Sequence, residues 1–200
     1  NVVASELKKE LKDNKDLAKD VDLLVSQTKR CGEILKQISQ KKIKDDEFFK
    51  RTNLENLLEE IITSFEEISS KRISLSSEKD KNKIMISRSP EIIYGLRNFI
   101  GNAVKFSKEK VEIKLNSNKN EIEIIIHDDG PGFPEDVIDI IGEPYIKSKS
   151  SNINQNAGTG LGTFLGKTFL ERSGAKLLFS NDKNGGAKVE IKFESKDLSN

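Results

Sequence analysis

A regular hydrophobic seam runs along residues 16–40. Its members recur at alternating spacings of four and three residues: Leu17, Val21, Leu24, Thr28, Cys31, Leu35 and Ile38. These spacings place them on one stripe of a helix that packs lengthwise against a partner helix. With a shorter amphipathic piece before Asp13, the pattern predicts a helical hairpin over residues 1–44. We expect the hairpin to dimerise as a four-helix bundle, because its two helices alone cannot bury both of their apolar seams. The alternative is that the hairpin packs against its own domain.

Helical periodicity returns after a charge-rich linker at residues 45–51. Thr52 or Asn53 can cap a helix that carries Leu54, Leu58, Ile61 and Phe65 on one face, and Ser89-Pro90-Glu91 is a typical helix start. This second helix carries apolar residues at the spacing of a core-facing stripe: Ile93, Leu96, Ile100 and Ala103 or Val104. A short helix is predicted after Pro134, and a longer one from Gly160 to about Arg172.

Strict alternation of apolar and polar residues predicts strands. They lie around Ile73 and Leu75, around Ile84 and Ile86, and at residues 111–115, 122–126, 176–180 and 188–193. Helices and strands are mixed without a regular strand–helix–strand order. This indicates an α+β domain over residues 52–200, with helices on one face of a mainly antiparallel sheet.

Composition limits the possible chemistry. The 200 residues carry a net charge of +1, so nothing indicates a nucleic-acid or strongly acidic partner. A single cysteine excludes an internal disulfide, and a single histidine leaves little for a zinc site. Any mechanism that needs an imidazole must use His127 or take one from elsewhere. Because the first residue is Asn1, we expect the chain to start inside a longer protein.

Three motifs are candidates for chemistry, and the first is a polar face on the helix after Ser89. Asn98, Asn102 and Lys105 are spaced to lie together, offering neutral oxygens for a hard cation and an ammonium for phosphate. An ordinary solvated helix face is the alternative. The second motif is Asp128-Asp129-Gly130-Pro131-Gly132-Phe133, at the end of an apolar strand. Its first carboxylate can accept a hydrogen bond from an amine such as that of adenine, although a tight turn would also explain the sequence.

The third motif is glycine-rich and opens a helix. In Gly158-Thr159-Gly160-Leu161-Gly162 the glycines let backbone amides approach an anion at a helix N-terminus. Residues 161–168 fall one glycine short of a P-loop, and the dinucleotide-binding pattern also fails at its third glycine. We therefore expect a phosphate-binding segment of neither of those two kinds.

Together, the three motifs resemble the N, G1 and G2 boxes of the GHKL ATP-binding domain of sensor histidine kinases, at residues 98–107, 128–133 and 158–162. Within that family the chain is most similar to the RegB/PrrB group of redox-responding kinases. Three segments carry this resemblance: residues 24–31, Gly142-Glu143-Pro144-Tyr145 and residues 170–175. The resemblance implies a GHKL two-layer α/β sandwich, with the hairpin as a truncated dimerisation and phosphotransfer domain.

The resemblance also implies roles for individual residues. Asn102 would coordinate Mg²⁺, with Asn98 and Lys105 near the phosphates of ATP, and Asp128 would bind the adenine amino group. Gly130 and Gly132 would shape the adenine pocket. Between Tyr145 and Gly158 would lie a mobile ATP lid, from which Lys147 or Lys149 would touch phosphate. The group that closes on the phosphates would be Gly158, Thr159, Gly160, Leu161 and Gly162.

Three positions depart from the family or leave alternatives open. The phosphoacceptor histidine of the family would lie upstream of Asn1. His127 does not replace that histidine, because we expect His127 to pack at a strand end. Thr163 stands where a bulkier aliphatic residue is usual. Cys31 is either a small packing residue of the seam or a redox-responsive thiol.

The resulting expectation is the cytoplasmic catalytic part of a two-component sensor histidine kinase. It would use MgATP to phosphorylate an upstream histidine, and the phosphoryl group would pass to an aspartate of a response-regulator receiver domain. The intact protein would be a homodimer in the bacterial inner membrane. The alternatives are a non-catalytic ATP-binding and dimerisation module, or a GHKL serine kinase of the anti-sigma type.

Overall fold

The computed structural model describes residues 51–77, 84–118, 120–144 and 161–194. All of them belong to one compact unit, Asp46–Asn200. The predicted hairpin at residues 1–44, and Cys31 with it, lies outside the described residues. In the described ranges, no helix is long and apolar enough to cross a membrane.

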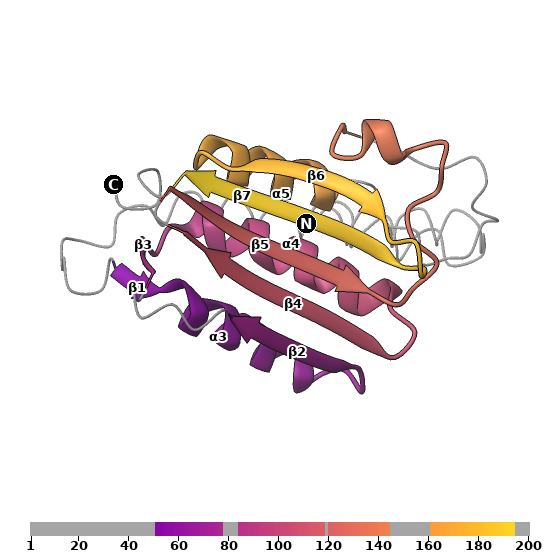
Figure 1. Cartoon of the computed structure of the whole chain (residues 1–200), viewed down its shortest axis with the longest axis horizontal. Helices are drawn as coiled ribbons and strands as arrows, with labels where there is room; N and C mark the ends of the chain where they lie inside the picture. Colours follow the sequence, from indigo (N-terminus) through magenta and orange to yellow (C-terminus); the bar gives the residue numbers. More distant parts are fainter. Residues whose placement is uncertain (1–50, 78–83, 119, 145–160, 195–200) are drawn as a thin grey trace, which may run out of the picture. The chain divides into compact units, whose positions relative to one another are not determined.

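A five-stranded sheet forms one layer (Figure 1). Its strands stand in the order β2-β4-β5-β7-β6. Only the β2–β4 pair is parallel among these neighbours, so the prediction of a mainly antiparallel sheet is confirmed. The bounds are β2 Arg72–Ser77, β4 Lys110–Ser117, β5 Glu121–Asp128, β6 Lys176–Asn181 and β7 Ala187–Glu194.

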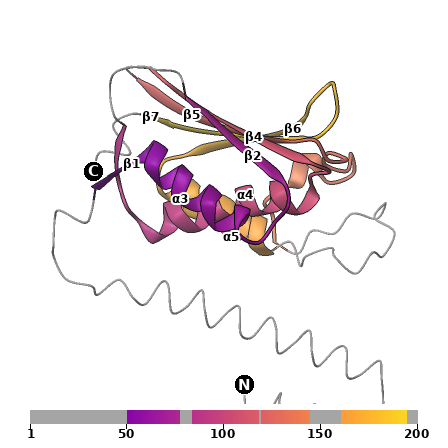
Figure 2. The ribbon, with the colours of Figure 1, turned by 90° about the horizontal axis from the view of Figure 1, so that it is seen from below.

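Helices α3 (Leu54–Glu66), α4 (Pro90–Phe106) and α5 (Leu161–Arg172) cover one face of this sheet (Figure 2). A small second sheet pairs β1 (Arg51–Asn53) with β3 (Met85–Ser87). The predicted α+β architecture with helices on one face is therefore confirmed. Strand β1 begins at Arg51, one residue inside the predicted linker.

Helix starts follow the predicted caps. The side chain of Asn53 accepts a hydrogen bond from the amide of Glu55 at 2.9 Å, and Ser89 accepts one from the amide of Ile92 at 3.1 Å. In α4 the buried side chain near the start is Ile92, whereas Ile93 is only half-buried. The helix is thus rotated slightly from the predicted apolar face, because Phe99 also turns into the core.

The segment after Pro134 differs from the prediction. A short helix was expected there, but the chain forms only the 3₁₀ turn η2 at Ile138–Ile140. Val137 and Ile141 at its two ends are buried, and no side chain caps it. Gly142 follows with φ at +90° and Pro144 comes two residues later, so the segment has no room for several α-helical turns.

Alternation along β5 separates the two faces of the sheet. Ile122, Ile124 and Ile126 are buried against the helices, and Asp128 continues this series as the last residue of the strand. The intervening positions, which include Glu123 and His127, face the side without helices. Asp128 is therefore a carboxylate at a core-facing position.

Helices α4 and α5 cross closely at two glycines. A Cβ added to Gly95 would lie 2.4 Å from Cγ of Leu170, and one added to Gly166 would lie 3.1 Å from Cβ of Asn98. The absent side chains let the two helix backbones approach each other. This crossing brings the N-terminal end of α5 alongside the C-terminal half of α4.

Candidate functional site

Asp128 is the central residue of the candidate site. Its side chain is only 5% exposed, and its Oδ1 accepts hydrogen bonds from the amides of Gly130 at 2.8 Å and Ala187 at 3.3 Å. In the described part of the chain, both hydrogen bonds to this carboxylate end on Oδ1. Burial raises the pKa of Asp128, while the two amides act in the opposite direction. The arrangement leaves Oδ2 as the oxygen that can receive a ligand donor.

Two glycines pack directly around Asp128. A Cβ on Gly130 would lie 2.4 Å from the carbonyl oxygen of Phe106 and 2.7 Å from Oδ1 of Asp128. At Gly186, where φ is +98°, a Cβ would lie 1.7 Å from the carbonyl oxygen of Asp128. Any larger residue would displace the backbone that holds the carboxylate. Gly130 was predicted as a site residue, whereas Gly186 was not.

The rest of the G1 segment is held by Asn181 at the end of β6. Its Oδ1 accepts a hydrogen bond from the amide of Phe133 at 2.7 Å, and its Nδ2 donates one to the carbonyl of Phe133 at 2.9 Å. Gly132, with φ at +81°, lies so close that a Cβ would be 2.7 Å from Oδ1 of Asn181. Sequence analysis missed Asn181. The available signal was its position, since it continues the core-facing series of Leu177 and Phe179 with a polar residue.

The polar face of α4 meets the start of α5. Nδ2 of Asn102 donates a hydrogen bond to Oγ1 of Thr163 at 3.2 Å, and Asn98 packs one turn earlier against Gly166. Thr163 therefore orients a predicted site residue, which the sequence analysis did not foresee. Because the amide nitrogen of Asn102 is engaged by Thr163, its carboxamide oxygen is the atom presented as an acceptor.

Lys105 and Phe106 end this helix on the exposed side. The ammonium of Lys105 lies 5.1 Å from the centroid of the Phe106 ring, which is 50% exposed. Since the backbone of Phe106 touches Gly130, the ring stands at the border between α4 and the loop of Asp128. An exposed aromatic ring at this position can stack on a planar ligand.

The start of α5 contributes backbone amides. Leu161 and Gly162 form the first positions of the helix, where backbone N–H groups are not used by the hydrogen bonds within the helix. The remainder of the predicted G2 and lid set lies outside the described residues: Tyr145, Lys147, Lys149, Gly158, Thr159 and Gly160.

A magnesium ion would find a limited protein ligand set here. In the residues that the structure describes, no group of three or more His, Cys, Asp or Glu side chains is placed to hold a metal. The oriented carboxamide oxygen of Asn102 suits Mg²⁺ as a single ligand, since Mg²⁺ usually keeps waters and binds substrate phosphates as well. The residues present fit an ion that arrives with a phosphate ligand.

His127 does not belong to this site. It precedes Asp128 in β5, so its side chain is on the opposite face of the sheet. Its Nε2 is 3.3 Å from the carbonyl oxygen of Gly185, and its Nδ1 is 4.0 Å from a carboxylate oxygen of Glu112. The expected strand-end packing of His127 agrees with these contacts, although the ring turns away from Asp128.

Comparison with known families identifies the domain. The model of the "Histidine kinase-, DNA gyrase B-, and HSP90-like ATPase" family matches residues 88–197, which is just over half of the chain. These residues include α4, Asp128 and α5. The matched domain is an ATP-binding domain, and the family is the one that the three boxes predicted.

A sensor histidine kinase is similar over most of the chain. Sensor histidine kinase RegB of Cereibacter sphaeroides is 36% identical over 189 residues, which cover 90% of this chain. The chain spans about 40% of the length of that relative. The likeness to the RegB group is thereby confirmed at the level of sequence.

Solved structures share the fold. The catalytic domain of histidine kinase ThkA has a TM-score of 0.60 at 21% identity, covering 72% of this chain and 96% of that one. The mycobacterial sensor histidine kinase MprB gives a TM-score of 0.60 at 16% identity, covering 72% and 95%. The chain belongs to the family of histidine kinase-, DNA gyrase B- and HSP90-like ATPases, and its described domain has the fold of a histidine kinase catalytic domain.

Proposed function

We propose that this chain is the ATP-binding catalytic part of a two-component sensor histidine kinase, and that ATP binds at Asp128 between α4 and α5. The observation that carries the proposal is the buried carboxylate of Asp128, with Oδ1 held by two backbone amides. A buried acceptor fixed in this way suits the exocyclic amino group of adenine. A ligand without a donor at that position would leave the buried carboxylate oxygen without a hydrogen bond. The 36% identity to RegB supports the same reading.

The other residues divide between the base and the phosphates. Gly130 and Gly132 shape the base pocket, and the ring of Phe106 stacks at its edge. Leu161 and Gly162 at the start of α5, with Gly158, Thr159 and Gly160 before them, offer amides to the phosphates. Asn98, Lys105, Tyr145, and Lys147 or Lys149 line the same end of the nucleotide. Asn102 would hold Mg²⁺, which neutralises phosphate charge when it is bound.

The reaction we propose is transfer of the γ-phosphoryl group to a histidine. The chain's one histidine is His127, which faces the sheet side opposite Asp128, so the acceptor comes from outside these 200 residues. We place it on the first helix of a dimerisation hairpin to which residues 1–44 contribute. The residues of the ATP site position the nucleotide and balance its charge, which is the main protein contribution in phosphoryl transfer.

The likeness to RegB supports wider proposals. The hairpin forms a homodimer as a four-helix bundle, and the phosphoryl group passes on to an aspartate of a receiver domain. The intact protein is a membrane sensor whose catalytic part lies in the cytoplasm.

Cys31 is a packing residue of the hairpin or a redox-responsive thiol. Replacing it with alanine decides between them, since a packing role predicts an unchanged response of kinase activity to oxidant.

Binding of MgATP by the 200-residue chain tests the site. Asp128→Ala and Asn102→Ala are each expected to abolish binding measured by calorimetry. Glu123→Gln and Asn116→Ala are matched controls, because these residues lie on the sheet face without helices and bond to each other at 3.1 Å. Unchanged affinity in both site variants would overturn the site. Acid-labile labelling of a chain extended about 20 residues upstream, with ATP as donor, tests the kinase reaction.

A further inference from the structure

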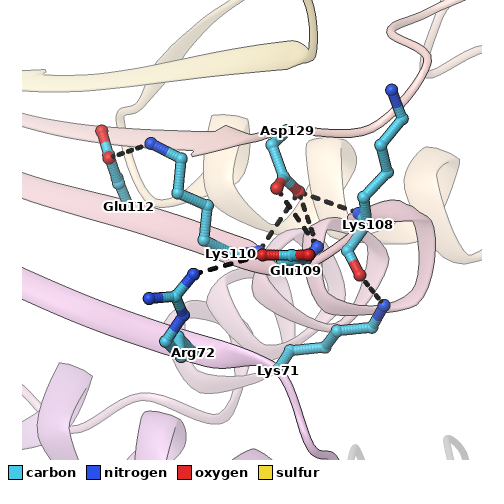
Figure 3. Close-up of polar contacts among 7 residues, drawn as sticks. All are labelled: Lys71, Arg72, Lys108, Glu109, Lys110, Glu112 and Asp129. Carbon is cyan, nitrogen blue, oxygen red and sulfur yellow. Dashed lines mark hydrogen bonds and ion pairs between the residues drawn. The ribbon is translucent and has the colours of Figure 1, made fainter.

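The segment from the end of α4 to the first residue of β4, residues 107–110, is held by a carboxylate on one side (Figure 3). The side chain of Asp129 accepts hydrogen bonds from three successive amides: Lys108 at 2.8 Å, Glu109 at 3.1 Å and Lys110 at 3.2 Å. The amide of Asp129 also donates to the carbonyl of Lys110 at 3.3 Å. The loop that follows β5 is thus fastened to the segment that follows α4.

The ammonium of Lys71 binds backbone carbonyl groups of the same segment (Figure 3). Nζ of Lys71 donates to the carbonyl of Ser107 at 3.0 Å and also to the carbonyl of Lys108. The next residue, Arg72, donates its backbone amide to the carbonyl of Glu109 at 2.9 Å. We call Lys71, residues 107–110 and Asp129 the bracket. In it the carboxylate of Asp129 binds backbone amides of the segment, and the ammonium of Lys71 binds its backbone carbonyls.

The bracket joins the two halves of the candidate site. On one side it continues from α4, which carries Asn98, Asn102 and Lys105. On the other side Asp129 is covalently next to Asp128, and Gly130 touches the carbonyl of Phe106 at the end of α4. A nucleotide has a limited span from base to phosphates, so the distance between these halves affects whether both ends can bind at once.

We propose that Asp129 and Lys71 are positioning residues for the nucleotide: they set the loop of Asp128 at a fixed distance from the polar face of α4. This inference rests on the proposed function. Neither side chain needs to touch the ligand, because the effect passes through the backbone of residues 107–110.

Charge alone predicts the opposite result for Asp129. Although desolvation raises its pKa, hydrogen bonds from the amides of Glu109, Lys110 and Lys108 together hold the pKa of Asp129 below its ordinary value. The residue is thus an anion near the site of a polyanionic ligand. Neutralising it should strengthen ATP binding if only long-range electrostatics mattered, whereas loss of positioning should weaken it.

Matched variants of the 200-residue chain test the carboxylate side. Asp129→Asn removes the charge and keeps one carbonyl acceptor, and Asp129→Ala removes both. Glu109→Gln removes a side-chain charge from the same segment and leaves the backbone hydrogen bonds of the bracket in place. Among the described residues the carboxylate of Glu109 pairs with Arg72 at 3.2 Å, and both side chains are more than 70% exposed. We expect the Kd for MgATP to rise at least about fivefold in Asp129→Asn and further in Asp129→Ala, since bonds to a charged acceptor are the strong ones. Glu109→Gln should leave it unchanged or lower it.

The ammonium side is tested with Lys71→Met against Arg72→Met, which remove the same charge from adjacent residues. Only Lys71→Met should raise the Kd by a similar factor. Amide exchange of residues 108–110, measured in each variant without ATP, should accelerate in the Asp129 variants and not in Glu109→Gln. This shows that the bracket itself has been opened, independently of any ligand.

The outcomes separate the two proposals. If the unaltered chain binds no MgATP, the proposed function falls and this inference falls with it. If the chain binds MgATP, and the Asp129 variants lose amide protection but keep their affinity within twofold, the bracket is structural only and the positioning role is overturned. Equal losses in Glu109→Gln or Arg72→Met would also overturn it, because charge would then explain the effect.

Discussion

Asp128 and Asp129 are neighbours in sequence, yet they occupy opposite environments. Asp128 is a core-facing residue of β5 with one oxygen engaged by amides, and burial raises its pKa. Asp129 lies in the loop after the strand, and three amides hold its pKa below the ordinary value. The end of β5 explains the difference: Asp128 is the last core-facing residue of the strand, whereas Asp129 follows it in the loop and reaches the amides of residues 108–110.

Exchanging Asp128 for asparagine should alter the choice of nucleotide. If the carbonyl oxygen of Asn still accepts from Gly130, its amino group then faces the ligand as a donor. Donor would meet donor at the adenine amine, so affinity for ATP should fall at least about tenfold. A base with a carbonyl at that position, such as that of ITP, should lose much less. The ratio of the two Kd values measures this, and an equal loss for both would contradict the base contact.

The two aspartates should also act with opposite sign on stability as the pH changes. The lowered pKa of Asp129 contributes stability above its unfolded pKa, and this contribution is lost as the pH falls through the folded value. The raised pKa of Asp128 means that the folded state binds the proton more tightly, so its charge costs stability at neutral pH.

Urea unfolding from pH 7 down to about 3 measures these contributions. The loss of stability in Asp129→Asn should be largest at neutral pH and shrink in acid. Asp128→Asn should instead gain relative stability at neutral pH, and this gain should fade in acid. Parallel curves for the two variants would contradict the assigned environments.

At the scale of elements, most starts and ends were predictable because they depend on local chemistry. Asn53 and Ser89 cap their helices as expected, and Pro90 begins α4. The exception is the segment after Pro134, where a helix start was present but Gly142, with φ at +90°, ends the segment after little more than one turn. Local signals therefore identified where a helix can begin better than how far it continues.

The α4–α5 crossing gives a prediction at this scale. Gly95→Ala places a Cβ 2.4 Å from the fully buried Leu170, so it should destabilise the fold by about 1–3 kcal/mol despite the better helix propensity of alanine. Gly101→Ala is the control, since its Cβ would meet the ring tip of the half-buried Phe65 at 2.9 Å. Chemical denaturation should rank Gly95→Ala as the more destabilised variant. The reverse order would mean that α4 and α5 can move apart at Gly95 without loss of stability.

At the scale of the whole molecule, the candidate site is assembled from segments far apart in the sequence. Asn102 comes from α4, Asp128 from the end of β5, Ala187 from β7, and Thr163 from α5. A ligand that binds all of them links elements across both layers, so it should stabilise the fold as one unit.

A thermal unfolding experiment measures that coupling. At MgATP concentrations 100-fold above Kd the stabilisation is about 2.7 kcal/mol, which corresponds to a rise in Tm of about 5–10 °C for a protein of this size. Chelating the magnesium should reduce the rise, because Asn102 would lose the ion that it shares with the phosphates. A Tm that ignores MgATP at millimolar concentration would contradict binding at this site.

The sequence by itself determined the fold class, the helix caps, and the three motifs that identify the family, because these depend on periodicity and on residues close together in the chain. Tertiary structure decided what those motifs contact. Only the folded chain shows that Thr163 orients Asn102, that Asn181 holds the Phe133 backbone, and that Asp129 binds the segment after α4. Each of these bonds joins residues at least 19 positions apart, and no local pattern encodes such a pairing.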